Sequence, residues 1–168
     1  YKSKKDTQAY MVRPKIIDAN RVLKFAEAEA LARNLINTPT SDMGPENLAS
    51  AVKNLANKFD AEYSEVVGEN LIQQNFPLIH AVGRASAQEP RLLEINNGSV
   101  GPKVTLVGKG VCFDTGGLNI KPGRSMGLMK KDMGGAANVL ALTSMILSTG
   151  MNIQLRVLIP AVENSISG

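Results

Sequence analysis

Apolar positions at a helical spacing run through residues 18–37 and predict an amphipathic helix. Asp18 precedes this helix as a suitable N-cap, and Pro39 follows it as a stop. A second helix is predicted from Gly44–Pro45, because proline fits the first position of a helix. The apolar faces comprise Val22, Phe25, Ala26, Leu31, Leu35 and Ile36 in the first helix, and Leu48, Val52 and Leu55 in the second.

Shorter apolar runs predict strands over residues 61–67, 91–95, 103–108 and 153–160. The run at 103–108 is compact and apolar enough for a strand that is buried on both faces. Between the strands, residues 69–75 predict a short helix ended by Pro77, and residues 135–148 predict a longer one with Gly150 as its C-cap. This order is typical of an α/β fold, with a mostly parallel or mixed sheet and helices on both faces.

Composition limits the class of protein. The 168 residues suit one domain, and 43% hydrophobic with 20% charged residues is ordinary for a soluble globular protein. Cys112 is the single cysteine, so no disulfide can form within the chain and a reducing, cytoplasmic location is expected. No apolar run is long enough to span a bilayer, so a membrane is not an expected partner.

Positive charge gathers near the N-terminus, where we expect residues 1–17 to form a linker or tail. The net charge of +4 is mild, and nucleic acid is a disfavoured partner because aromatic residues do not alternate with these charges. The chain begins at Tyr1 rather than Met and ends on the loop-like residues 161–168, from which we expect a piece of a longer polypeptide. The basic residues concerned are Lys2, Lys4, Lys5, Arg13 and Lys15.

The segment VGKGVCFDTGGLNIKPGRSMGLMKKDMGG, residues 107–135, follows a predicted strand at the end where α/β sheets bind ligands. A phosphate-binding loop of the form G-x-x-x-x-G-K-[ST] is excluded, because residue 103 is Lys and Gly110 follows Lys109. The dinucleotide pattern G-x-G-x-x-G also fails, because residue 113 is Phe. Neither phosphate motif therefore explains the glycines.

A carboxylate metal site is the remaining candidate, since one histidine cannot form the H-E-x-x-H zinc motif. Asp114 and Asp132 could bind or bridge divalent ions. A lysine beside cations loses its proton readily, so Lys109 could act as a nitrogen ligand, while a charged Lys121 could polarise a carbonyl. An ordinary glycine-rich loop with solvated lysines and capping aspartates is the alternative that the residues leave open. Glycines that could approach an ion or adopt positive φ are Gly108, Gly110, Gly116 and Gly117.

Two other reactive side chains have structural interpretations. His80, within PLIHAVGRAS, is expected to be a structural histidine near a turn. Cys112 lies between Val111 and Phe113 and is expected to be a buried thiol rather than a nucleophile.

Three segments in the same order resemble the leucyl (cytosol) aminopeptidases, which are M17-type di-metal exopeptidases. They are VGKGVCFDTGGLNIKPGRSMGLMKKDMGGAANV at 107–139, NTPTSDMGPENLA at 37–49 and HAVGRASAQEPRLLEI at 80–95. The resemblance covers nearly all of residues 18–168 and implies that they form the N-terminal part of the catalytic domain.

The resemblance implies a metal-dependent aminopeptidase that releases N-terminal residues, leucine-like ones preferred, from peptide substrates. It implies two divalent metal ions (Zn or Mn) with bicarbonate as a general base, a bridging hydroxide as the nucleophile, and a homohexamer. Lys109 and Asp132 would bind the more loosely held metal, and Asp114 would bridge both. Lys121 would polarise the scissile carbonyl and stabilise the oxyanion. Residues near the substrate would be Asn119, Met126 and Met129.

The chain departs from the family in what it lacks. A later N-T-D-A-E-G-R motif, which in the family supplies two carboxylate ligands and the arginine that holds bicarbonate, is absent, as is the N-terminal domain. We therefore expect these 168 residues alone to be inactive. The competing hypothesis is a truncated relative that acts as a binding module for DNA or protein.

Overall fold

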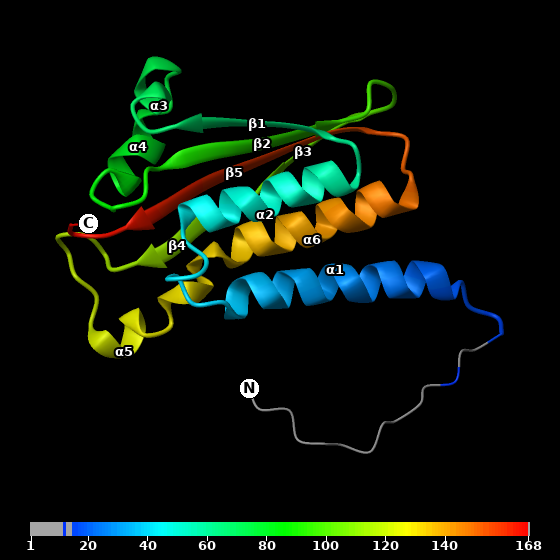
Figure 1. The fold of residues 1–168 in the computed structure, drawn as a ribbon, viewed down its shortest axis with the longest axis horizontal. Coiled ribbons are helices and arrows are strands. Elements are labelled where there is room, and N and C mark those ends of the chain that lie inside the picture. The colour runs from blue at the N-terminus through cyan, green and yellow to red at the C-terminus, as the bar shows by residue number, and fades with distance from the viewer. Residues whose placement is uncertain (1–11, 13–14, 168) are drawn as a thin grey trace.

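The computed structural model describes residue 12 and residues 15–167, which fold as a mixed α/β unit. Most of the predicted linker or tail at residues 1–17 lies outside the described residues. Figure 1 shows the elements in chain order. They are α1 (Ala19–Asn37), α2 (Pro45–Lys58), β1 (Glu62–Val67), α3 (Asn70–Gln73), α4 (Pro77–Gly83), β2 (Arg91–Asn97), β3 (Lys103–Val107), β4 (Gly110–Asp114), α5 (Gly123–Met126), the 3-10 helix η1 (Met129–Met133), α6 (Gly134–Thr149) and β5 (Gln154–Asn164).

The sheet is organised around β5, the last strand of the described chain. Its strand order is β1-β2-β5-β3, and β4 also pairs with β5, beyond the point where β3 ends. The β1–β2 and β2–β5 pairs are antiparallel, whereas β3 and β4 run parallel to β5. The expected α/β class with a mixed sheet is confirmed, and the parallel part is confined to the strands that lead into the glycine-rich segment.

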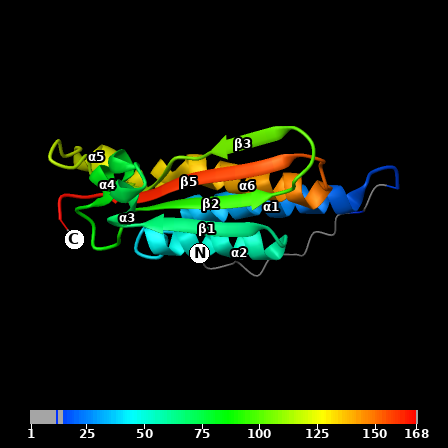
Figure 2. The same cartoon turned by 90° about the horizontal axis from the view of Figure 1, so that it is seen from above.

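The three long helices, α1, α2 and α6, lie together on one face of the sheet, rather than on both faces as the sequence predicted (Figures 1 and 2). The core forms between them and the inward side chains of β2 and β5, such as Leu93, Ile95, Val157 and Ile159. The short α4 packs against the C-terminal end of β5, where Gly83 contacts Val162. No helix among the described residues is long and apolar enough to cross a membrane.

The predicted helix ends are confirmed, but part of the predicted α1 face is wrong. Asp18 caps α1 by accepting hydrogen bonds from two backbone N–H groups, and Gly150 caps α6 with φ of 65°. In α1 the buried residues are Ala28, Ala32 and Leu35, whereas Val22 and Ala26 are exposed. Small side chains permit the close approach of α1 to α6, so the contact follows alanines rather than the bulkiest residues.

Strand β3 is not buried on both faces as predicted. It is an edge strand whose residues alternate between exposed and half-buried, and Val107 is 65% exposed. Its inward residues Val104 and Leu106 pack on the core, while the residues that alternate with them face away from it. The strand is therefore buried on one face only. Other elements also differ from the prediction: Pro77 begins α4 as well as following α3, β4, α5 and η1 form within the glycine-rich segment, and β5 continues to Asn164 through residues that the sequence suggested were loop.

Candidate functional site

The glycine-rich segment holds two lysine–aspartate pairs. Lys109 Nζ lies 2.8 Å from Asp132 Oδ1, and Lys121 Nζ lies 2.7 Å from Asp114 Oδ2. Lys109 immediately precedes strand β4, and Asp114 is its last residue. Asp132 lies in η1, which packs against that strand. The fold therefore gathers these four residues around one short strand, as two ion pairs rather than four solvated side chains.

A bulge in β4 determines how Asp114 is presented. Val111 pairs with Val162 and Phe113 with Glu163, so Cys112 is the extra residue between them. Such a bulge resets the alternation of side chains along a strand, and it is a common feature beside functional sites. Asp114 ends the strand opposite Asn164, the last residue of β5.

Three hydrogen-bond donors surround the Asp114 carboxylate. Oδ2 accepts from Lys121, while Oδ1 accepts from the backbone N–H of Gly116 at 2.9 Å and from Asn164 Nδ2 at 2.7 Å. Burial on its own raises the pKa of Asp114, but the hydrogen bonds from Lys121, Gly116 and Asn164 outweigh it and bring the pKa below its usual value. Asp114 is therefore held as a charged carboxylate in a fixed orientation.

The loop after Asp114 turns through two glycines in the left-handed region. Gly116 has φ of 90° and Gly117 has φ of 62°, as the sequence predicted, and a Cβ on Gly116 would lie 2.3 Å from Asn119 O. The backbone N–H of Lys121 then donates to Thr115 O at 2.8 Å, which closes the loop. This turn returns Lys121 to the carboxylate that lies seven residues earlier.

Gly108 and Gly110 have a packing role. A Cβ on Gly108 would lie 2.7 Å from Ala136 Cα, and one on Gly110 would lie 2.6 Å from Pro160 O. Since the contacting atoms are backbone, the first turn of α6 and strand β5 approach the Lys109 segment as closely as glycine permits. The Lys109 carbonyl also accepts from the N–H of Ala136 at 2.9 Å, which fixes its backbone.

The two carboxylate oxygens of Asp132 differ in their hydrogen bonding. Its Oδ2 is buried and forms an ion pair with Lys109 Nζ at 2.7 Å, but it accepts no directed hydrogen bond from the residues that the structure describes. A buried acceptor without a directed donor is uncommon in folded proteins. Within the described residues, no group of three or more His, Cys, Asp and Glu side chains is placed to hold a metal ion. Any cation would therefore rest on Asp114, Asp132 and a lysine nitrogen, together with groups outside this set.

The predicted substrate-binding residues lie in the same segment. Asn119 is exposed in the loop between Gly117 and Lys121, Met126 ends α5 and Met129 begins η1. Both methionines are half-buried. Their role stays a prediction. Sequence reasoning missed Asn164, and only the rule that parallel strands end at a common edge could have indicated it.

The two residues given structural interpretations behave as expected. Cys112 is 1% exposed, and burial, with a contribution from the Glu163 carboxylate, raises the pKa of its thiol to about 12. His80 lies in α4 with its Nε2 3.2 Å from Glu69 Oε1, which links α4 to the residue preceding α3. Neither residue contacts the lysine–aspartate pairs through a hydrogen bond in the part of the chain that the structure describes.

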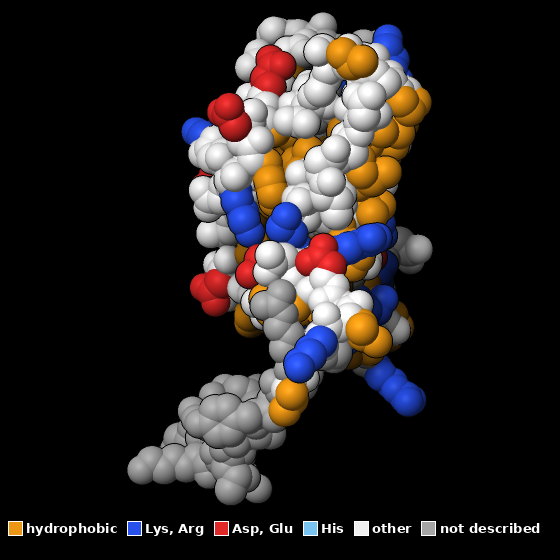
Figure 3. All heavy atoms as spheres, turned by 90° about the vertical axis from the view of Figure 1, so that its right-hand side faces the viewer, with side chains coloured by type: hydrophobic (Ala, Val, Ile, Leu, Met, Phe, Trp, Pro, Cys, Tyr) orange, Lys and Arg blue, Asp and Glu red, His pale blue; other side chains and the backbone are white. Residues whose placement is uncertain are grey.

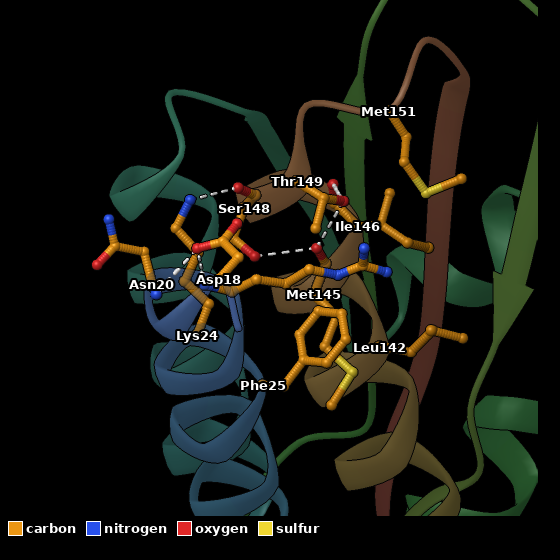
Figure 4. A pocket seen from close by; sticks show the side chains of 11 residues that line it. Asp18, Asn20, Lys24, Phe25, Leu142, Met145, Ile146, Ser148, Thr149 and Met151 are labelled. Carbon is orange, nitrogen blue, oxygen red and sulfur yellow. Dashed lines mark hydrogen bonds between the residues drawn. The ribbon is translucent and has the colours of Figure 1, made fainter. Parts of the chain in front are cut away.

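A cavity of about 650 Å³ lies away from these pairs, between the start of α1 and the end of α6. Figure 4 shows Lys24 reaching across it to the Ser148 carbonyl, at 2.7 Å. That end of the molecule faces the viewer in Figure 3, where hydrophobic and basic side chains lie side by side. The cavity is lined by the second half of α6, from Leu142 onward, whereas Asp132 precedes the first residue of that helix. It therefore belongs to a different region from the candidate site.

Comparisons with known proteins agree with this arrangement. Residues 30–168 match the model of the cytosol aminopeptidase family, catalytic domain. The chain is 51% identical to a cytosol aminopeptidase from Coxiella burnetii of known structure, with a TM-score of 0.84, and the match covers 87% of this chain and 32% of that one. The bottromycin maturation enzyme BotP in complex with Mn gives 36% identity and a TM-score of 0.82, over 89% of this chain and 33% of that one.

A relative named "Probable cytosol aminopeptidase" from Aquifex aeolicus is 38% identical over 100% of this chain and 36% of its own length. The chain thus spans about a third of the length of the relatives that it matches. The family model covers residues 30–168, which include α2, the whole sheet and both lysine–aspartate pairs. On that match, this chain belongs to the cytosol aminopeptidase family.

Proposed function

We propose that this chain carries part of the active site of a metal-dependent aminopeptidase that removes N-terminal residues, leucine-like ones preferred, from peptides. The observation that supports it most is the pairing of Lys109 with Asp132 and of Lys121 with Asp114 around one strand end. Together the two pairs provide the two kinds of group that peptide hydrolysis needs: metal ligands, from Asp114, Asp132 and Lys109, and a donor for the developing oxyanion, from Lys121.

In this proposal Asp114, Asp132 and Lys109 bind two divalent ions, Zn or Mn, of which Asp114 would touch both. The donor set fits, because divalent cations bind carboxylate oxygens and the buried Asp132 Oδ2, which is paired with the Lys109 ammonium, accepts no directed hydrogen bond from the described residues. The complex of the related BotP with Mn also supports a divalent ion. Bound divalent ions supply Lewis-acid activation of water and of the peptide carbonyl.

Lys121 is assigned to the substrate. Its ammonium now pairs with Asp114, and its side chain is 29% exposed, so it can turn to a peptide without unfolding its loop. When Asp114 Oδ2 binds another partner in place of Lys121, the Lys121 ammonium can donate to the carbonyl oxygen of the scissile bond. It would then stabilise the negative charge that develops on that oxygen. Met126, Met129 and Asn119 are proposed to border the first side chain of the peptide.

The rest of the machinery is proposed to lie outside these 168 residues. The family resemblance implies further carboxylate ligands, a bicarbonate general base, a homohexamer and a cytoplasmic location. The competing proposal is a binding module without activity. A coding sequence that continues beyond Gly168 into an N-T-D-A-E-G-R motif supports the enzyme, and a stop codon there supports the module.

The activity test compares two proteins. The full coding product, loaded with Mn(II) or Zn(II), is expected to release leucine from a leucyl anilide, to lose this activity with a chelator and to regain it with metal. The 168-residue chain alone is expected to release none. A full product that binds no divalent ion and cleaves no aminoacyl anilide would contradict the proposed function.

A further inference from the structure

Asn164 makes two separate sets of contacts at the end of β5. Its main-chain oxygen accepts from the backbone N–H and from the hydroxyl of Thr115, both at 2.9 Å. Its side-chain amide instead donates to Asp114 Oδ1, at 2.7 Å. Main-chain contacts hold the loop in place whatever the side chain is, so the amide is available for another purpose.

The amide fixes one oxygen of Asp114 and leaves the other for an exchangeable partner. Oδ1 is held by Asn164 and by the N–H of Gly116, both of which are uncharged donors from fixed positions. Oδ2 is held by the ammonium of Lys121, which belongs to a side chain with several rotatable bonds. If Lys121 moves away, the Asp114 carboxylate keeps its orientation, because Oδ1 retains the hydrogen bonds from Asn164 and Gly116.

We propose that Asn164 is a positioning residue, which fixes the Asp114 carboxylate so that Oδ2 points to where a divalent cation binds. This inference rests on the proposed function of Asp114 as a metal ligand. Groups that orient a ligating side chain by hydrogen bonding commonly change metal affinity by about 10- to 100-fold when they are removed. An alternative role, in which Asn164 only closes the loop, is served by its main chain and needs no amide.

The test uses Asn164→Ala and Asn164→Leu in the full-length protein. Leucine has the same number and branching of side-chain heavy atoms as asparagine but no donor, so it separates the loss of the amide from the opening of a cavity. Asn96→Ala is the matched control, because Asn96 Nδ2 also donates to a carboxylate, that of Glu94, at 2.8 Å on strand β2. Mn(II) affinity is measured by titration calorimetry, and backbone hydrogen exchange of Gly116 is measured without metal.

Both Asn164 variants are expected to bind Mn(II) about 10- to 100-fold more weakly than the parent, with a cooperative unfolding transition retained. Without metal, the Gly116 amide is expected to exchange about fivefold faster, because its acceptor is no longer held. Asn96→Ala is expected to change neither quantity.

Mn(II) affinity within twofold of the parent in both Asn164 variants would overturn the inference. So would unchanged exchange at Gly116, whatever the metal does. If the parent itself binds no Mn(II), the proposed function fails and the metal part of this inference fails with it. Gly116 exchange then still decides whether the amide of Asn164 fixes the carboxylate.

Discussion

Gly108 and Ala136 touch so closely that a Cβ atom on the glycine would lie 2.7 Å from the Cα of the alanine. Gly108 is the first residue after β3, and Ala136 lies in the first turn of α6. Both contacting groups are main chain, so neither can rotate away. This contact holds Lys109, the next residue, against the helix that follows Asp132, and it connects the packing of the core to the candidate site.

Replacement of Gly108 by alanine is expected to lower the free energy of unfolding by about 1–3 kcal/mol, since a methyl group must displace backbone. Gly123→Ala is the control, because no atom lies within 4 Å of a Cβ at that position, at the start of α5. Urea unfolding followed by circular dichroism measures both. Equal urea midpoints for the two variants would show that the backbone of α6 can move enough to accommodate a methyl group at Gly108.

Arg91 should show an asymmetry between its removal and the removal of its partners. Its guanidinium is buried and lies 3.3 Å from both Glu46 and Glu65, which are far more exposed. Arg91→Leu leaves two glutamates that water can solvate, so we expect a loss of stability of at most about 1 kcal/mol. The double variant Glu46→Gln, Glu65→Gln leaves a buried charge without a counter-ion and is expected to cost about 2–3 kcal/mol.

Thermal and urea unfolding of Arg91→Leu and of the double glutamine variant test this prediction. A larger loss in Arg91→Leu than in the double glutamine variant would mean that packing of the arginine stem, rather than the buried charge, controls this junction of α2, β1 and β2.

Glu94 predicts a pH dependence of stability. The hydrogen bond from Arg156 lowers the pKa of Glu94, with a further contribution from Asn96, against the opposing effect of burial. A carboxyl group whose pKa is lower in the folded than in the unfolded protein stabilises the fold above the unfolded pKa, about 4.3, and loses that effect as pH falls through the folded pKa.

Glu94→Gln is therefore expected to be less stable than the parent at pH 7, and the difference is expected to shrink as pH falls from about 5 to 3. Glu62→Gln on β1 is the control, since Glu62 forms no ion pair within the described residues. Urea midpoints at several pH values test it. A difference that grows on acidification would contradict the assigned shift.

Lys121→Met in the full-length protein is expected to lower kcat by about 10²–10³ while the bound metal content is unchanged, because the donor to the developing oxyanion is lost. Lys131→Met replaces an exposed lysine of the same segment and should leave kcat unchanged. Steady-state kinetics and metal analysis are made on the same samples. Loss of metal from Lys121→Met would reassign the lysine to holding Asp114 in place.

Helices could be predicted from the sequence where local chemistry controls them. Asp18, Pro45 and Gly150 act at helix ends through their own side chains or backbone, so their effect needs no knowledge of distant residues. The burial of β3 could not be predicted in this way. Whether an apolar strand is central or at an edge depends on β5, which is inserted between β2 and β3 from far along the chain.

The candidate site shows the same division. Lys109, Asp114, Lys121 and Asp132 could be identified from their types and spacing, and by resemblance to a family. Their pairing could not, because the Asp114–Lys121 pair depends on the bulge at Cys112 and on the turn at Gly116, and the Lys109–Asp132 pair depends on the packing of η1 against β4. Asn164 was missed because β5 was expected to end at residue 160, which placed the asparagine in a loop without partners.

The dependence of the sheet on its last strand has a consequence for synthesis on the ribosome. Strands β3 and β4 pair with β5 and with no other described strand, and β5 is made after all of them. A nascent chain that has emerged only as far as α6 holds helices and the β1–β2 pair, while the residues of both lysine–aspartate pairs still lack their supporting strand. Assembly of the strand end that carries both lysine–aspartate pairs must wait for the residues of β5, a delay that long-range parallel pairing imposes and during which the strand edges stay exposed to chaperones.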